Sequence, residues 1–120
     1  MITVTVWRTE DHMICRFKAS GHAGYAPAGN DIICSAITAI TTTAIGSLAD
    51  IAGLETDHTM RDGLIECRLK QDRPMTDRQR ETAAIILESM LLGCRQIEES
   101  YGRTYVQVRE KQIHQGGTWS

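Results

Sequence analysis

The sequence predicts an α+β fold: a single small domain in which two helices pack on a mostly antiparallel sheet of about five strands. Three observations predict this fold. The 120 residues suffice for one compact core. Five short segments alternate between apolar and polar residues, as half-buried strands do. Two longer stretches carry apolar residues at helical spacing, and the elements follow as strand, strand, helix, strand, strand, helix, strand.

The N-terminal part predicts a hairpin followed by a loop. Residues Ile2 to Arg8 alternate and are rich in β-branched side chains, which predicts a strand. Thr9 to His12 are polar and predict a turn, and Met13 to Ala19 alternate again. Ser20 to Asn30 contain three glycines and a proline, so we expect a loop with little regular structure.

The first predicted helix is capped by Asn30 or Asp31, runs to about Ala52 and stops at Gly53. No charged residue lies between Asp31 and Asp50. We reject a membrane span because small polar residues interrupt the stretch: Ser35, Thr38, Thr41, Thr42, Thr43, Gly46 and Ser47. A helix without charge on any face is expected to be buried on several sides, and a second copy of the chain supplies that cover in a predicted homodimer.

The C-terminal half predicts a second hairpin. The dipeptide Asp62-Gly63 favours a two-residue turn between strands at Glu55 to Arg61 and Leu64 to Lys70.

A helix and a last strand follow this hairpin. Thr76 and Gln79 form a capping-box pattern ahead of a helix at about Asp77 to Ser100, and Gly102 ends it. Thr104 to Arg109 alternate as the last strand.

We assign residues 1–113 to the domain and residues 114–120, which contain Gly116-Gly117, to a flexible tail. The net charge of −2 and the lack of a basic cluster predict no direct nucleic-acid partner and no membrane partner. No secretory signal is evident and no C-x-x-C pair occurs. We therefore expect a cytoplasmic protein with reduced thiols and no zinc site.

The segment from Gly21 to Ala36 carries the candidate chemistry. Cys34 falls in the first turn of the first predicted helix, where unpaired N–H groups and the helix dipole favour a thiolate and provide donors for an oxyanion. The glycine loop brings His22 back toward that helix start, so the imidazole accepts the thiol proton and later protonates a leaving amine. Asp31 is near enough to orient His22 or bind substrate, although its charge raises the pKa of Cys34.

Each of these residues also has a structural interpretation. A lone cysteine on an apolar helix serves packing in roughly four cases of five, and the other three cysteines are expected in the core. A lone histidine in a loop is more often a surface residue. The site hypothesis therefore depends on the combination of a thiol at a helix start, an imidazole at a strand end and a flexible loop between them.

Two short motifs give a resemblance to a known family. They are Gly21-His22-Ala23-Gly24-Tyr25-Ala26 and Asp31-Ile32-Ile33-Cys34-Ser35-Ala36, with Gly29 between them. At this segment the chain resembles the ribosomal-processing cysteine protease family, called Prp. Outside it the agreement is one of pattern, in length and element order.

The resemblance implies a cysteine endopeptidase, a hydrolase of ribosome biogenesis. Its members remove the N-terminal extension of a large-subunit ribosomal protein precursor in Firmicutes-type bacteria, cutting after a pair of aromatic residues. It implies His22 and Cys34 as the catalytic pair, an assisting Asp31, no metal or cofactor, and a homodimer formed through helices. It also implies a mobile loop, for which the hinge glycines are Gly21, Gly24 and Gly29. The family often has serine where this chain has Thr38.

Two other functions remain open at this point. A ribosome-associated module without catalysis would use the same loop to clasp a peptide, and a slowly reacting Cys34 would favour it. A thiol-redox protein would use Cys34 with a resolving cysteine, but none lies nearby in the sequence.

Overall fold

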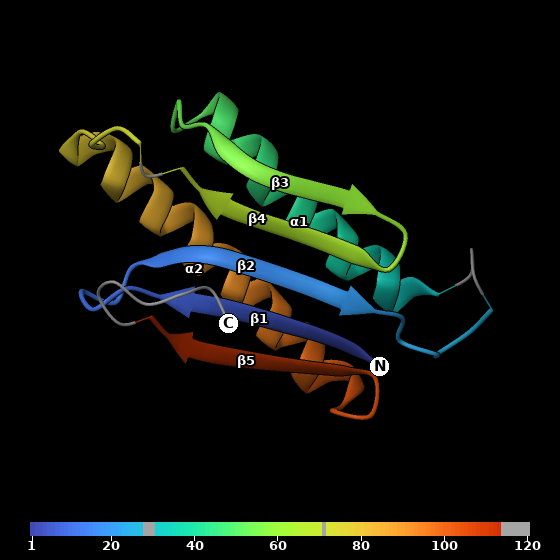
Figure 1. Cartoon of the computed structure of the whole chain (residues 1–120). Coiled ribbons are helices and arrows are strands. Elements are labelled where there is room, and N and C mark those ends of the chain that lie inside the picture. Colours follow the sequence, from blue (N-terminus) through green and yellow to red (C-terminus); the bar gives the residue numbers. More distant parts are fainter. Residues whose placement is uncertain (28–30, 71, 114–120) are drawn as a thin grey trace.

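A computed structural model describes residues 1–27, 31–70 and 72–113. Within these residues, seven elements follow along the chain (Figure 1): β1 (Ile2–Arg8), β2 (Ile14–Gly21), α1 (Ile32–Asp50), β3 (Thr56–Arg61), β4 (Leu64–Leu69), α2 (Asp77–Tyr101) and β5 (Val106–Gln112). This order confirms the predicted fold class. The predicted flexible tail at 114–120 and the predicted hinge Gly29 lie outside the described residues.

The five strands form one sheet in the order β3-β4-β2-β1-β5. Every neighbouring pair is antiparallel except β1 and β5, which are parallel because α2 carries the chain back across the sheet. Both helices lie on one face of this sheet, and among the described residues no helix covers the other face (Figure 1).

The core lies between the sheet and the two helices. Alternation along β1 directs Ile2, Val4 and Val6 toward the helices, where all three are buried in the core cluster. Phe17 of β2 is fully buried beside them. Truncating such a side chain to alanine typically costs about 3–5 kcal/mol, so this layer contributes much of the stability of the domain.

Helix α1 begins at an aspartate cap. The Asp31 carboxylate accepts hydrogen bonds from the backbone N–H groups of Ile33 (3.0 Å) and Cys34 (3.1 Å), so Asp31 is the cap in the described structure. Its apolar stripe is buried: Ile33, Ile37, Thr41, Ala44, Ile45 and Leu48. By length and composition alone α1 is apolar enough to cross a membrane, a test that the core helix of a soluble domain also passes.

Helix α2 has the predicted capping box. The Thr76 hydroxyl accepts from the Gln79 N–H at 3.1 Å, and the Gln79 side-chain oxygen accepts from the Thr76 N–H at 3.0 Å. Gly102 caps the other end at φ +95°, in the left-handed region that favours glycine. The two caps explain why the predicted bounds of α2 are correct to one residue.

Several chain segments meet at one edge of the sheet. The end of β2, the start of β1, the β3–β4 turn and the first turn of α1 all lie there (Figure 1). A hydrogen bond of 2.9 Å from the Gly21 N–H to the Gly63 carbonyl joins the end of β2 to the β3–β4 turn. This edge therefore brings together residues from four parts of the sequence.

Candidate active site

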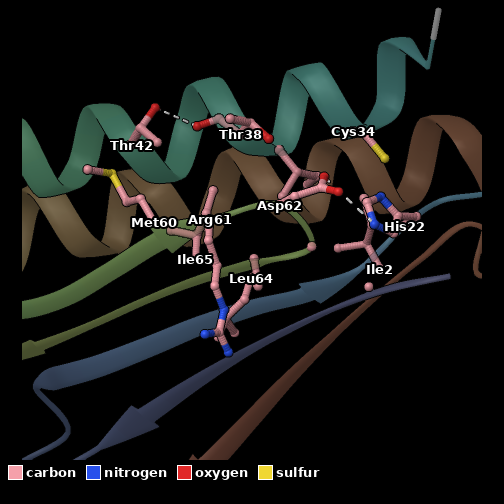
Figure 2. A pocket seen from close by; sticks show the side chains of 14 residues that line it. Ile2, His22, Cys34, Thr38, Thr42, Met60, Arg61, Asp62, Leu64 and Ile65 are labelled. Carbon is pink, nitrogen blue, oxygen red and sulfur yellow. Dashed lines mark hydrogen bonds and ion pairs between the residues drawn. The ribbon is translucent and has the colours of Figure 1, made fainter. Parts of the chain in front are cut away.

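A cavity of about 380 Å³ opens at this edge, between α1 and the β3–β4 hairpin. Cys34 and His22 both line it, and Figure 2 shows the Cys34 sulfur directed toward the end of the cavity at which the His22 ring lies. The structure thus brings the two predicted reacting residues to one cavity.

Cys34 differs from the other three cysteines in its exposure. Cys34 is partly exposed, whereas the other three thiols are buried. Burial raises the pKa of these three thiols to about 11, 11 and 12, in the order Cys15, Cys67 and Cys94. Their predicted role in the core agrees with these positions, and only Cys34 faces the cavity.

The Cys34 thiol is a hydrogen-bond donor in this conformation. Its sulfur lies 3.3 Å from Oδ2 of Asp31, to which the thiol donates, and it accepts from the Ala23 N–H at 3.3 Å. Burial raises the pKa of the thiol, the Asp31 carboxylate raises it further, and the Ala23 N–H opposes both effects. The expectation that the helix start holds Cys34 as a thiolate is therefore wrong for this conformation.

The thiol is not ionised because Asp31 accepts the hydrogen bonds of the N–H groups at the helix start. Its side chain takes the N–H groups of Ile33 and Cys34, and its backbone carbonyl accepts from the Ser35 N–H at 3.1 Å. These three N–H groups already donate to Asp31, so they are not free to bind an oxyanion in this conformation. The expected oxyanion site formed by the N–H groups around Cys34 is therefore not present here. The Ala23 N–H is the backbone donor aimed at the sulfur.

Asp31 itself is held as a carboxylate. It is only 7% exposed, and burial raises its pKa, but the hydrogen bonds from Cys34 and Ile33 outweigh burial and lower the pKa. These contacts account for Asp31 as a cap and as a partner of the thiol, whereas its predicted contact with His22 stays a prediction.

His22 is anchored through its backbone and exposed through its ring. The N-terminal ammonium of Met1 donates to the His22 carbonyl, while the His22 side chain is 61% exposed. Its Nε2 lies 3.9 Å from Oδ1 of Asp62, in the β3–β4 turn (Figure 2). His22 is therefore held at its backbone, and a carboxylate lies beside the Nε2 atom of its exposed ring.

Asp62 is a site residue that sequence reasoning missed. The sequence marked Asp62-Gly63 only as a hairpin turn, and the pairing of β2 with β4 carries that turn to His22. Gly63 permits the approach, because a Cβ atom there would lie 3.1 Å from His22 Nε2. The dipeptide was the available signal, but the partner of the hairpin was not readable from it.

The predicted hinge glycines differ in their surroundings. Gly21 is the last residue of β2 at φ +94°, and a Cβ there would collide with the Met1 carbonyl oxygen, so its role is to allow close packing. Gly24 has φ +72° and nothing within 4 Å of a Cβ position, which suits a hinge. The hinge role of Gly24 stays a prediction.

Apart from its polar mouth, the cavity has an apolar lining. Ile2, Ile37, Ile65 and Met60 contribute side chains to it, and Thr38 and Thr42 present hydroxyl-bearing side chains from α1. The lining suits an apolar side chain of a peptide, with the peptide backbone near Cys34. Among the described residues, no group of histidine, cysteine, aspartate and glutamate side chains is arranged to hold a metal ion.

Comparison with known proteins identifies a family for the chain. The family model described as cysteine protease Prp matches residues 1–107. The ribosomal processing cysteine protease Prp of Bacillus subtilis (strain 168) is 27% identical over 101 residues, which cover 84% of this chain and 90% of that protein. The protein of the same name from Staphylococcus aureus is 24% identical over 101 residues, covering 84% of this chain and 92% of that protein.

Solved structures show the same fold. The S. aureus protease Prp with a covalently linked product peptide has a TM-score of 0.79 at 24% identity, covering 92% of this chain and 100% of that chain. SMU.848 from Streptococcus mutans has a TM-score of 0.78 at 23% identity, covering 93% of this chain and 95% of that chain. Because the family model spans nearly all of the sequence, the chain belongs to the cysteine protease Prp family.

Proposed function

We propose that this protein removes the N-terminal extension of a large-subunit ribosomal protein precursor, with Cys34 as nucleophile and His22 as general base and acid. The observation that carries the proposal is a partly exposed thiol at a helix start that shares one cavity with an imidazole. The names of the B. subtilis and S. aureus relatives support the ribosomal substrate. Membership in a family of cysteine proteases sets aside the alternative of a peptide-binding module without catalysis.

The first step is a proton transfer. In the resting state the Cys34 proton is directed to Asp31. When a peptide enters the cavity, the thiol turns to His22, the S–H proton passes to the ring, and the thiolate attacks the carbonyl carbon of the scissile bond. The Ala23 N–H, already aimed at the sulfur, stabilises its negative charge.

The remaining steps return the enzyme to its starting state. The tetrahedral intermediate collapses, the C–N bond breaks, and the leaving amine takes the proton from His22. A thioester then links the extension to Cys34. His22 removes a proton from water, the hydroxide attacks the thioester, and the C–S bond breaks to release the extension. The proton returns to the Cys34 sulfur.

The cavity next to Cys34 supports a preference for aromatic residues before the cut. Its lining includes Met60, which is 53% exposed, and the buried side chains of Ile37 and Ile65. An aromatic ring entering there is removed from water, which stabilises the bound peptide. We propose this cavity as the acceptor of one aromatic residue of the cleavage sequence.

The test compares histidine and cysteine variants on a precursor peptide. Cys34→Ala and His22→Ala are each expected to lose cleavage, while His58→Ala, which alters an exposed histidine on β3, retains it. The cut site is identified by mass spectrometry, after an aromatic pair. Cleavage that survives Cys34→Ala contradicts the proposal.

We also propose that the protein forms a homodimer through its helices. A groove of about 450 Å³ lies between α1 and α2, and no charged residue lines it. Ile85 and Leu92 of α2 are exposed by 62% and 59%. A second copy covering this face would bury these side chains.

Sedimentation tests the dimer. The wild type is expected to be a dimer at micromolar concentration and Ile85→Lys a monomer. Ile51→Lys is the matched control, since Ile51 is 70% exposed at the end of α1 and outside the groove. A monomeric wild type contradicts the proposal.

With a ribosomal protein as substrate, we propose the cytoplasm as the place of action. Cell fractionation tests this localisation.

A further inference from the structure

The open face of the sheet carries a charge opposite to that of the chain. Strand register places three rows of five side chains on this face. Two of these positions are acidic, Asp57 and Glu66, and six are basic: Arg16, Lys18, Arg61, Arg68, Arg109 and Lys111. The face thus carries a formal charge of +4, while the whole chain carries −2.

Two of the six cations are neutralised locally. Arg16 pairs with Glu66 at 2.8 Å, and Arg68 pairs with Asp57 at 2.5 Å. Within 1–27, 31–70 and 72–113, no carboxylate lies within ion-pair distance of the other four, Lys18, Arg61, Arg109 and Lys111.

These four cations are spread over the face. They come from β2, β3 and β5. Arg109 and Lys111 are two residues apart on β5, which spaces them by about 6.7 Å along the strand. Lys18 lies two strands away from Arg109 in the same row, about 10 Å across the sheet. A ligand that meets all of them must be an extended polyanion.

The rest of the face distinguishes a nucleic acid from a protein. None of the large hydrophobic side chains that are exposed in the described structure lies on this face. Trp7 is only 4% exposed, with the Arg16 guanidinium 4.2 Å from its ring centroid. Protein interfaces depend on exposed aromatic or aliphatic anchors, whereas phosphate and sugar contacts use cations, hydroxyls and amides. Thr3, Ser20 and Gln107 supply such hydroxyl and amide groups.

We infer that the open face of the sheet binds RNA through its phosphate backbone. The cations contact the phosphates, and the hydroxyl and amide groups suit the ribose 2′-hydroxyl. The prediction of no nucleic-acid partner rested on the net charge and on the lack of a basic cluster along the sequence, whereas β alternation gathers cations from three strands on one face. This face lies on the opposite side of the sheet from the helices and the catalytic cavity, so the inference goes beyond the proposed function and does not depend on it.

The experiment uses the full chain and a fluorescein-labelled oligouridine of about twenty nucleotides. Fluorescence anisotropy gives the dissociation constant at several salt concentrations. The test variant replaces three cations of the face, Lys18→Gln, Arg109→Gln and Lys111→Gln. The matched control replaces three cations outside it, Arg73→Gln, Arg78→Gln and Arg103→Gln. Circular dichroism and cleavage of the precursor peptide check that both variants fold.

The wild type is expected to bind RNA with affinity that falls steeply with salt. The face variant should bind about tenfold or more weakly, with a salt slope reduced by about 2, and the control variant should bind like the wild type. Both variants should keep peptidase activity. Absence of binding by the wild type at low salt, or equal loss in both triple variants, overturns the inference. Equal affinity for an oligodeoxyuridine of the same length overturns the choice of RNA. Tighter binding of polyglutamate than of the oligouridine overturns the inference and identifies the face as a protein-binding surface instead.

Discussion

Replacing Asp31 by asparagine separates its two roles at the start of α1. Asparagine keeps a side-chain oxygen for the N–H groups of Ile33 and Cys34, and it caps helices about as well as aspartate. The substitution removes the negative charge whose Oδ2 lies 3.3 Å from the Cys34 sulfur. The helix should therefore persist while the thiolate becomes easier to form.

The magnitude follows from that distance. Two like charges this close repel by about 1.3 kcal/mol at the dielectric constant of water, and several times more at a protein surface. Because the Cys34 thiol is partly exposed, we use the lower figure, which corresponds to about a tenfold rise in the thiolate fraction near neutral pH.

The assay is the rate of alkylation by iodoacetamide as a function of pH. Asp31→Asn should react about tenfold faster than the wild type at pH ~7, and its rate profile should shift to lower pH. Asp50→Asn, which removes a charge from the other end of α1, should react like the wild type. Cys34→Ala reports the background from the buried cysteines. An unchanged or slower rate in Asp31→Asn, with the helix content intact, refutes the assignment of Asp31 as the group that keeps the thiol neutral.

The remaining predictions concern stability and the histidine. Gly21→Ala should lower the free energy of unfolding by about 2 kcal/mol or more in urea denaturation, because alanine is strained at φ +94° and its Cβ meets the Met1 carbonyl; a loss under about 0.5 kcal/mol contradicts this. Asp62→Asn should change the NMR chemical shifts of the His22 ring protons, since it removes the carboxylate 3.9 Å from Nε2; unchanged shifts mean that the pair is not formed in solution. The free energy of unfolding from urea denaturation should fall as pH rises above about 9, by up to about 1.4 kcal/mol per pH unit for each buried thiol, because the unfolded chain ionises its thiols while the folded chain keeps them protonated; a free energy that stays level to pH ~10.5 contradicts the raised pKa values of Cys15, Cys67 and Cys94.

Local chemistry in the sequence predicted most of the fold. The Thr76–Gln79 capping box and the Asp62-Gly63 turn depend on residues a few positions apart, and both are present as predicted. Strand ends were less predictable because pairing with a distant neighbour determines them. β5 continues to Gln112 rather than Arg109, since β1 provides partners as far as Arg8.

The candidate site was predictable only where sequence neighbours form it. Asp31 and Cys34 share one helix turn, and the loop motif contains His22. Asp62 approaches His22 through the pairing of two strands far apart in the sequence, so no local pattern marks it. The helix-dipole argument also gave the wrong direction for the Cys34 pKa. It did not include the cap, which engages the backbone donors and places a carboxylate beside the sulfur.

The central claim is that the Cys34 sulfur bonds covalently to the substrate carbonyl. Rapid acid quenching of the enzyme with a precursor peptide, followed by intact and peptide mass spectrometry, tests it directly. We predict a transient adduct with the mass of the released extension less one water, located on the peptide that contains Cys34 and absent from Cys34→Ala. Cleavage by the wild type with the adduct on another cysteine, or cleavage by Cys34→Ala at the wild-type rate, would contradict the account.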